Sequence, residues 1–160
     1  EIVEFCLKGP MVPPGYWQNE EATSKALVND YFYTGDLVRQ DEEGFLYVVD
    51  RKKSMFISGG ENVYPAEVER MVRLHPLVDE AALVGVADEK WGEVGKLFIT
   101  LSNNNQFDEA QFKSFCIEKM AKFKVPKYIE ILEEMPKNDS GKIDRKGLTQ
   151  KAKAHEKTTN

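Results

Sequence analysis

Cysteine and histidine are scarce in this chain of 160 residues, which holds two of each. Cys6 and Cys116 lie far apart with no histidine near either, so the sequence supports neither a disulfide framework nor a metal site of the zinc type. We expect both thiols to be reduced, as in a cytoplasmic protein. Apolar runs of membrane-spanning length and signal-peptide patterns are also lacking, although a chain that begins at Glu1 rather than methionine leaves targeting open.

An excess of positive charge is lacking too, because the formal net charge is -5. Nucleic-acid-binding proteins normally carry a basic face or stripe, so that class is disfavoured. The charge is nevertheless uneven along the chain. Residues 1–50 hold ten acidic and three basic side chains, whereas residues 142–160 hold six basic and two acidic ones, a balance that could receive an anion. Taken alone, such a basic end is most often a solvated tail.

What is present fits a folded chain of mixed secondary structure. The hydrophobic fraction of 41% is ordinary for globular proteins, and a chain of this length buries about two-thirds of its surface. A glycine pair at 59–60 predicts a hairpin turn. Short apolar stretches bounded by turn residues predict strands at 2–7, 31–33, 45–49, 81–86, 96–101 and 128–132.

Three helix starts are marked by residues that favour the first turn. Asn19 precedes two glutamates, Pro65 opens a second helix, and Asp108 with Gln111 three residues later resembles a capping box. Four apolar residues share one face of the third helix, and we assign them to the core rather than to a cofactor contact: Phe112, Phe115, Cys116 and Met120.

Three sequence blocks carry most of the functional information. The first is Tyr33-Thr34-Gly35-Asp36, the second is DRKKSMFISGGENVYPAEVE at residues 50–69, and the third is PKNDSGKIDR at residues 136–145. In this order they resemble the carboxyl-terminal part of the AMP-forming acyl-CoA synthetases, a superfamily that includes luciferases and peptide-synthetase adenylation domains. The resemblance runs from about Glu1 to Lys151, and three ordered motifs make it more specific than any one of them.

The resemblance implies an enzyme that activates a carboxylic acid. The carboxylate attacks the α-phosphate of ATP, pyrophosphate leaves, and the acyl group then passes to CoA. The implied cofactors are ATP, CoA and Mg, the last held mainly by the amino-terminal domain. The run from Ile57 to Glu69 looks most like that of bacterial long-chain and medium-chain fatty acyl-CoA ligases, so a fatty acid is the expected substrate. Ligases of aryl acids share most of this run, whereas luciferases have lysine in place of Ile57.

The same resemblance sets the expected domains. Residues 1–52 would be the β-rich carboxyl-terminal edge of a large adenylate-forming domain, residue 53 the hinge, and residues 154–160 a polar tail. Residues 54–153 are expected to form a small, mobile α+β domain with a short sheet flanked by helices. Several aromatic side chains of residues 1–52 should then lack the surface that covers them in the complete enzyme.

For the nucleotide, the resemblance implies that Asp36 accepts hydrogen bonds from both ribose hydroxyls and that Arg51 also contacts the ribose. A carboxylate suits this task because it offers only acceptors. By sequence alone, an aspartate after a glycine is more often a turn residue and an arginine more often a surface charge, and the motif context reverses both interpretations. Lys142 matches the catalytic lysine of adenylation, which also contacts ATP.

Lys53 matches the hinge, where the family carries lysine or aspartate, because a long charged side chain stays solvated in both arrangements of a pivot. Without the motif, it would be one charge of a basic surface run. The resemblance assigns Ser58, Gly59, Gly60 and Glu61 to the loop that binds CoA along its pantetheine arm. Glycine permits close approach of backbone to a ligand, although a glycine pair alone most often only makes a turn.

Three more residues match positions that contact the nucleotide part of CoA in some relatives, namely Trp91, Phe123 and Lys124. An aromatic face can stack on adenine and an ammonium can meet phosphate. This outer part of the CoA site differs between families.

We expect the isolated chain to be inactive, because the resemblance puts the acyl pocket, the phosphate loop and the magnesium ligands in the amino-terminal domain. Its partners would be that domain, the acid and CoA, and a homo-oligomer is left open. Two alternatives remain: an adenylation domain that loads a carrier protein, and a non-catalytic module that binds nucleotide, CoA or a partner. Asp36, Arg51 and Lys142 together favour the enzyme, since binding alone would not need all three, although fold resemblance does not fix function.

Overall fold

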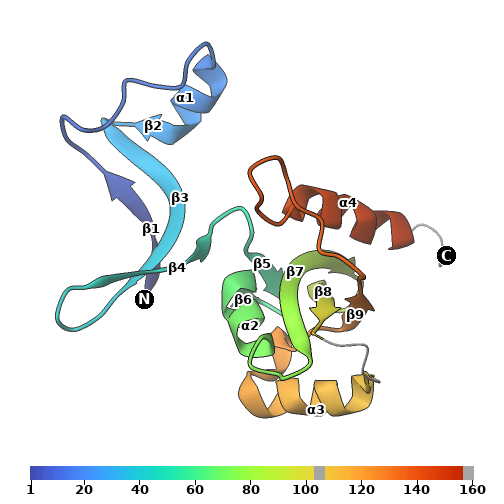
Figure 1. The fold of residues 1–160 in the computed structure, drawn as a ribbon. Coiled ribbons are helices and arrows are strands. Elements are labelled where there is room, and N and C mark those ends of the chain that lie inside the picture. The colour runs from blue at the N-terminus through green and yellow to red at the C-terminus, as the bar shows by residue number, and fades with distance from the viewer. Residues whose placement is uncertain (103–106, 157–160) are drawn as a thin grey trace. The chain divides into compact units, whose positions relative to one another are not determined.

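The computed structural model describes residues 1–102 and 107–156. It divides the chain into two compact units, Glu1–Lys53 and Ser54–Asn160 (Figure 1). The boundary falls in the turn at residues 52–54.

The first unit is an antiparallel sheet built around one long strand, β3. Strand β1 pairs along one side of β3, and β2 and β4 pair with the beginning and the end of its other side. Asn19 caps the single helix through a hydrogen bond from the backbone of Ala22 to its side chain, as predicted. The elements are β1 (Ile2–Leu7), α1 (Glu20–Ala26), β2 (Leu27–Val28), β3 (Tyr31–Gln40) and β4 (Leu46–Arg51).

The first unit has little core of its own. Leu37 and Val38, in the second half of β3, are the buried residues among residues 1–53. Several aromatic side chains are exposed as expected, among them Trp17 at 89% and Phe45 at 61%. Large aromatic groups at such exposure are costly to keep in water, because each could remove a large apolar area from solvent.

The second unit is a mixed sheet with helices on both faces (Figure 1). Strand β8 pairs antiparallel with β7 along its length and parallel with β9, and it meets the β5–β6 hairpin at one pair of residues. The elements are β5 (Phe56–Ser58), β6 (Glu61–Val63), α2 (Pro65–Val72), β7 (Val78–Asp88), β8 (Gly92–Leu101), α3 (Glu109–Lys119), the 3-10 helix η1 (Lys122–Lys124), β9 (Tyr128–Ile131) and α4 (Arg145–Glu156).

Side chains of β7 and β8 alternate between two cores, as the period of a strand requires. Leu83, Leu97 and Ile99 belong to the core that α2 and α3 cover, with Phe112 and Cys116 of α3 buried in it. Phe98 belongs to the opposite core with its neighbours from the same strands, and α4 closes that core with Leu148 and Ala152. A sheet with both faces buried explains the consecutive apolar residues at 81–84 of β7 and 97–99 of β8.

The predicted α+β class is confirmed, as are the hairpin at 59–60 and the starts of α1, α2 and α3. The sequence analysis did not predict α4, which begins at Arg145 and continues to Glu156 and so includes the first residues of the expected polar tail at 154–160. The sequence contains only a weak signal for this helix, the apolar pair Leu148 and Ala152 at helical spacing. Residues 157–160 lie outside the described residues. No helix of the described part is long and apolar enough to cross a bilayer.

A second, polar contact holds α4 on the sheet. Glu130 of β9 accepts from Lys96 at 2.8 Å and from Lys151 of α4 at 2.7 Å. Burial by itself would raise the pKa of Glu130, but the hydrogen bonds from the two lysines outweigh it and lower the pKa. The carboxylate therefore stays ionised between the two ammonium groups, and it contacts α4 at Lys151, six positions after the first residue of the helix.

Candidate functional site

Asp36 and Arg51 are direct neighbours across the β3–β4 ladder. Arg51 Nε lies 2.8 Å from Asp36 Oδ1, and Arg51 Nη1 donates to the carbonyl oxygen of Thr34 at 3.0 Å. The Asp36 side chain is 29% exposed and that of Arg51 56% exposed. Two residues that lie 15 positions apart in sequence thus form one carboxylate–guanidinium pair, in which both side chains stay partly exposed.

The turn before Asp36 fixes the direction of its side chain. Thr34 Oγ1 donates to the carbonyl of Phe5 at 2.8 Å and accepts from the Asp36 amide at 3.1 Å. Gly35 has φ of +74°, a backbone conformation that residues with a Cβ rarely adopt. The glycine in this motif is therefore required by backbone geometry, and the strand bends so that the Asp36 side chain meets Arg51.

Lys53 is exposed in the turn between the two units, and its role as a hinge stays a prediction. Its neighbour Lys52 is bound to the first unit, because Lys52 Nζ lies 2.7 Å from Glu4 Oε2 and that hydrogen bond raises the pKa of Lys52. The side chain of Lys52, the first residue of the turn, is therefore held by the first unit.

The glycine pair forms the turn of the β5–β6 hairpin, with φ of +60° at Gly59 and +89° at Gly60. Positive φ at both central residues is the requirement of a type I′ turn. The Gly59 amide donates to the carbonyl of Trp91 at 2.9 Å, and a Cβ on Gly59 would lie 2.8 Å from the Trp91 ring. Ser58 is buried and Glu61 exposed. The structure thus brings the predicted CoA loop and Trp91 together.

Phe123 and Lys124 lie on η1, in a separate cluster. Lys124 Nζ contacts both carboxylate oxygens of Glu67, at 2.7 and 2.9 Å, and lies 5.7 Å from the centre of the Phe123 ring. A surface pocket of about 200 Å³ opens beside Lys124, with Glu67 and Arg70 in its wall, and Trp91 does not line it. A phosphate group at Lys124 would have to compete with Glu67.

Lys142 is exposed on a loop that the side chain of Asn138 organises. Asn138 Oδ1 accepts from the Ser140 amide at 3.1 Å, the Ser140 hydroxyl at 2.7 Å and the Lys142 amide at 3.0 Å. The Asn138 amide also donates to the carbonyl of Lys142 at 2.7 Å, and Gly141 completes the turn with φ of +76°. The loop therefore presents Lys142 from a backbone that is fixed on both sides of the residue.

The base of this loop is closed by hydrogen bonds of its own. Lys137 and Ile143 form an antiparallel bridge, and the Asp144 amide donates to the carbonyl of Pro136 at 2.8 Å. Asp144 Oδ1 accepts from the Gly147 amide at 3.0 Å, which caps the first turn of α4. Sequence reasoning identified Lys142 but missed the role of Asn138, whose signal was an asparagine followed by Asp-Ser-Gly, a typical turn composition.

Residues 67–142 match the family model of the AMP-binding enzyme C-terminal domain. The 2-succinylbenzoate–CoA ligase of Geobacillus kaustophilus is 48% identical over 148 residues, which are 92% of this chain and 30% of the relative. That of Listeria innocua is 47% identical over 92% of this chain and 31% of the relative. This chain therefore spans about 30% of the length of these curated relatives.

Solved structures give the same result. The o-succinylbenzoate-CoA synthetase of Bacillus subtilis in complex with its acyl-adenylate intermediate has a TM-score of 0.85 and 40% identity, covering 92% of this chain and 30% of that one. A fatty acyl-CoA synthetase of Mycobacterium tuberculosis has a TM-score of 0.69 and 40% identity, covering 96% and 30%. The expected special likeness to fatty acyl-CoA ligases is not supported by the curated relatives, which are named for 2-succinylbenzoate.

Asn138→Ala should loosen the Lys142 loop while leaving its fold in place. The substitution removes the acceptor of two backbone amides, so we expect those of Ser140 and Lys142 to exchange with solvent about 10-fold faster. Hydrogen exchange followed by NMR would measure both, with the Leu83 amide in β7 as an internal reference. Asn138→Asp keeps an acceptor and should leave the rates nearly unchanged. Equal protection in the alanine variant would show that Asn138 does not hold the loop.

Proposed function

We propose a reaction for this chain from the premise that it is the carboxyl-terminal part of an AMP-forming CoA ligase. The complete enzyme would join a carboxylic acid to CoA in two steps and convert ATP to AMP and pyrophosphate. The observation that carries the proposal is the Lys142 loop, because its ordered backbone presents an exposed ammonium within a domain of this family.

In the first step, a carboxylate oxygen of the acid bonds to the α-phosphorus of ATP and the bond to pyrophosphate breaks. Negative charge accumulates around the phosphorus as the fifth bond forms. The Lys142 ammonium would stabilise that charge, and a positioned group of this kind contributes about 3 to 4 kcal/mol. Asp36 would accept from the ribose hydroxyls, with Arg51 holding the carboxylate from the opposite side.

In the second step, the sulfur of CoA attacks the carbonyl carbon of the acyl-adenylate and AMP leaves. We assign the pantetheine arm to the β5–β6 hairpin, where Gly59 and Gly60 bring backbone close to a narrow ligand. Trp91 packs on Gly59 and would contact the same arm or its nucleotide. Phe123 and Lys124 lie in a different cluster, and Lys124 would reach a phosphate only after leaving Glu67. We assign the change of arrangement between the steps to Lys53.

For the acid, we propose an aryl acid of the 2-succinylbenzoate type. This proposal is supported by the names of the curated relatives at 47% and 48% identity. The likeness to a fatty acyl-CoA synthetase, at the lower TM-score, makes a fatty acid the competing candidate.

The acid is identified by a panel tested on the full-length enzyme, with pyrophosphate release as the readout. A pocket built for the second carboxylate of 2-succinylbenzoate leaves polar groups unpaired when a fatty acid binds, so we expect kcat/KM for fatty acids to be lower by about 10⁴-fold. Preference for a fatty acid would overturn the choice of acid. If no acid of the panel led to pyrophosphate release, the proposed ligase activity itself would be overturned. The isolated chain should release no pyrophosphate.

Lys142→Ala in the full-length enzyme should slow adenylate formation by roughly 10²- to 10³-fold, because it removes a charge that acts in that transition state. Thioester formation from supplied acyl-adenylate and CoA should be nearly unchanged. Rapid-quench measurement of the two half-reactions separates these effects. Equal losses in both steps would contradict the role assigned to Lys142. The matched control is Lys146→Ala, which removes an exposed lysine of α4.

Lys53→Pro should affect the opposite step. Proline fixes φ near −65° and so restricts the backbone of the turn at residues 52–54. Apart from this restriction, the substitution removes one exposed positive charge. We expect slower thioester formation with adenylate formation largely retained, measured by the same half-reactions. Lys53→Ala, which removes the charge and leaves the backbone free, serves as control. Unchanged thioester kinetics in the proline variant would mean that the pivot lies elsewhere.

A further inference from the structure

Glu69 is a charged residue in the interior of the second unit. It lies on α2 and is 5% exposed, although carboxylates are almost never buried without a partner. Its neighbours on α2, Val68 and Val72, are buried in the apolar core. Burial of a carboxylate destabilises the fold unless both of its oxygens accept hydrogen bonds. The hydrogen-bond donors around Glu69 therefore indicate its structural role.

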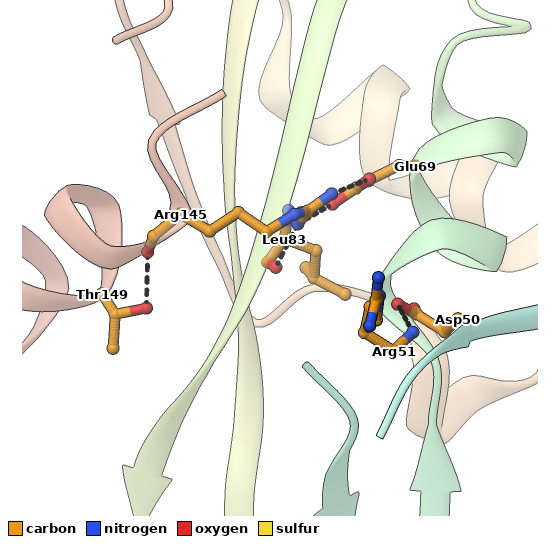
Figure 2. A network of polar contacts seen from close by, with 6 residues as sticks. All are labelled: Asp50, Arg51, Glu69, Leu83, Arg145 and Thr149. Carbon is orange, nitrogen blue, oxygen red and sulfur yellow. Dashed lines mark hydrogen bonds and ion pairs between the residues drawn. The ribbon is translucent and has the colours of Figure 1, made fainter. Parts of the chain in front are cut away.

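The partners of Glu69 come from the far end of the sequence (Figure 2). Arg145 Nη1 donates to Glu69 Oε1 at 2.7 Å and Nη2 donates to Oε2 at 2.7 Å, a two-pronged pair between residues 76 positions apart. Glu69 Oε1 also accepts from the Leu83 amide at 2.8 Å. Arg145 thereby joins α2 and β7 to the first residue of α4, three positions after Lys142.

The Lys142 loop needs such an attachment. Its internal bonds around Asn138 fix its shape, but shape alone does not fix where the loop stands on the domain. On the entry side, Met135 is buried in the core beneath α4. On the exit side, Arg145 makes the paired contact with Glu69, and its own carbonyl accepts from Thr149 Oγ1 at 2.8 Å (Figure 2). Lys137 and Glu80 add one contact at 3.2 Å between partly exposed side chains.

We propose that Glu69 and Arg145 are positioning residues for adenylate formation: the pair sets the place of the Lys142 ammonium on the domain. This inference rests on the proposed function of Lys142. The guanidinium fork has one orientation in which both bonds form, so it fixes direction as well as distance, which a lysine in place of Arg145 would not do. Because both residues and Lys142 belong to the same unit, the contact is kept when that unit turns.

The test uses Glu69→Gln in the full-length enzyme, which keeps the size of the side chain and removes the charge that holds the fork. A displacement of about 1 Å at a reacting group costs about 100-fold in rate, so adenylate formation should fall by about that factor while thioester formation stays within about 3-fold. A substitution that only weakens the fold would lower both half-reactions through loss of folded enzyme.

The matched control is Glu130→Gln. It removes the same charge in the same unit and breaks two ion pairs to lysines, but those pairs join β9 to Lys96 of β8 and to Lys151 of α4, and neither involves a residue of the Lys142 loop. Both half-reactions should stay within about 3-fold in this variant, since no reacting group is displaced. Thermal unfolding of both variants would show how much stability each has lost.

Arg145→Lys decides the question if Glu69→Gln does not fold. It keeps the charge beside Glu69 and loses the fork, so adenylate formation alone should fall, by less than in Glu69→Gln. Equal losses in both half-reactions, or no loss in either, would overturn the positioning role. A wild-type enzyme that releases no pyrophosphate with any acid would instead overturn the proposed function.

Discussion

The second unit depends on a sheet that is buried on both faces. Side chains of β7 and β8 alternate between a core closed by α2 and α3 and a core closed by α4. Both faces of β7 and β8 carry buried apolar residues, so helices must cover both faces, and α4 is as necessary as the others. Arg145, the first residue of α4, contacts Glu69 of α2 around β7, where the carbonyl of Leu83 lies 3.4 Å from Arg145 Nη1. The loop with Lys142 is thereby tied to both layers of the unit.

Local patterns were enough to predict most elements of this fold. The apolar runs of β7 and β8 are strand signals in themselves, and Asn19 and Asp108 cap α1 and α3 as their sequence context indicates. Helix α4 was missed because Leu148 and Ala152 are its buried apolar residues among the side chains that the structure describes. A segment rich in lysine with two apolar residues resembles a solvated one. Its stability comes from tertiary packing, which a local window does not contain.

The candidate site divides in the same way. The motif residues were identified from the resemblance of three sequence blocks to a known family, and in the structure each block contains a local turn with a glycine at positive φ, namely Gly35, Gly59 and Gly141. The pairs that give the motifs their geometry are not local. Asp36 meets Arg51 through the β3–β4 ladder, and Glu69 meets Arg145 across 76 positions. The sequence around Glu69 does not show whether its carboxylate is buried or exposed on an amphipathic helix. Its burial and its pairing with Arg145 are seen only in the folded structure.

The charged residues of the candidate site differ in how strongly they are already paired. Lys124 has both oxygens of Glu67 within hydrogen-bond distance, and Asp36 has Arg51 at 2.8 Å, whereas Lys142 is exposed at the tip of an ordered loop. A ligand that binds at Lys124 must displace the carboxylate of Glu67. The binding free energy then contains only the difference between the new ion pair and the one that is lost. A ligand at Lys142 meets an ammonium whose backbone is already fixed, so little ordering is required when charge develops beside it. That difference favours a transition-state role for Lys142 and a weaker, exchangeable contact at Lys124.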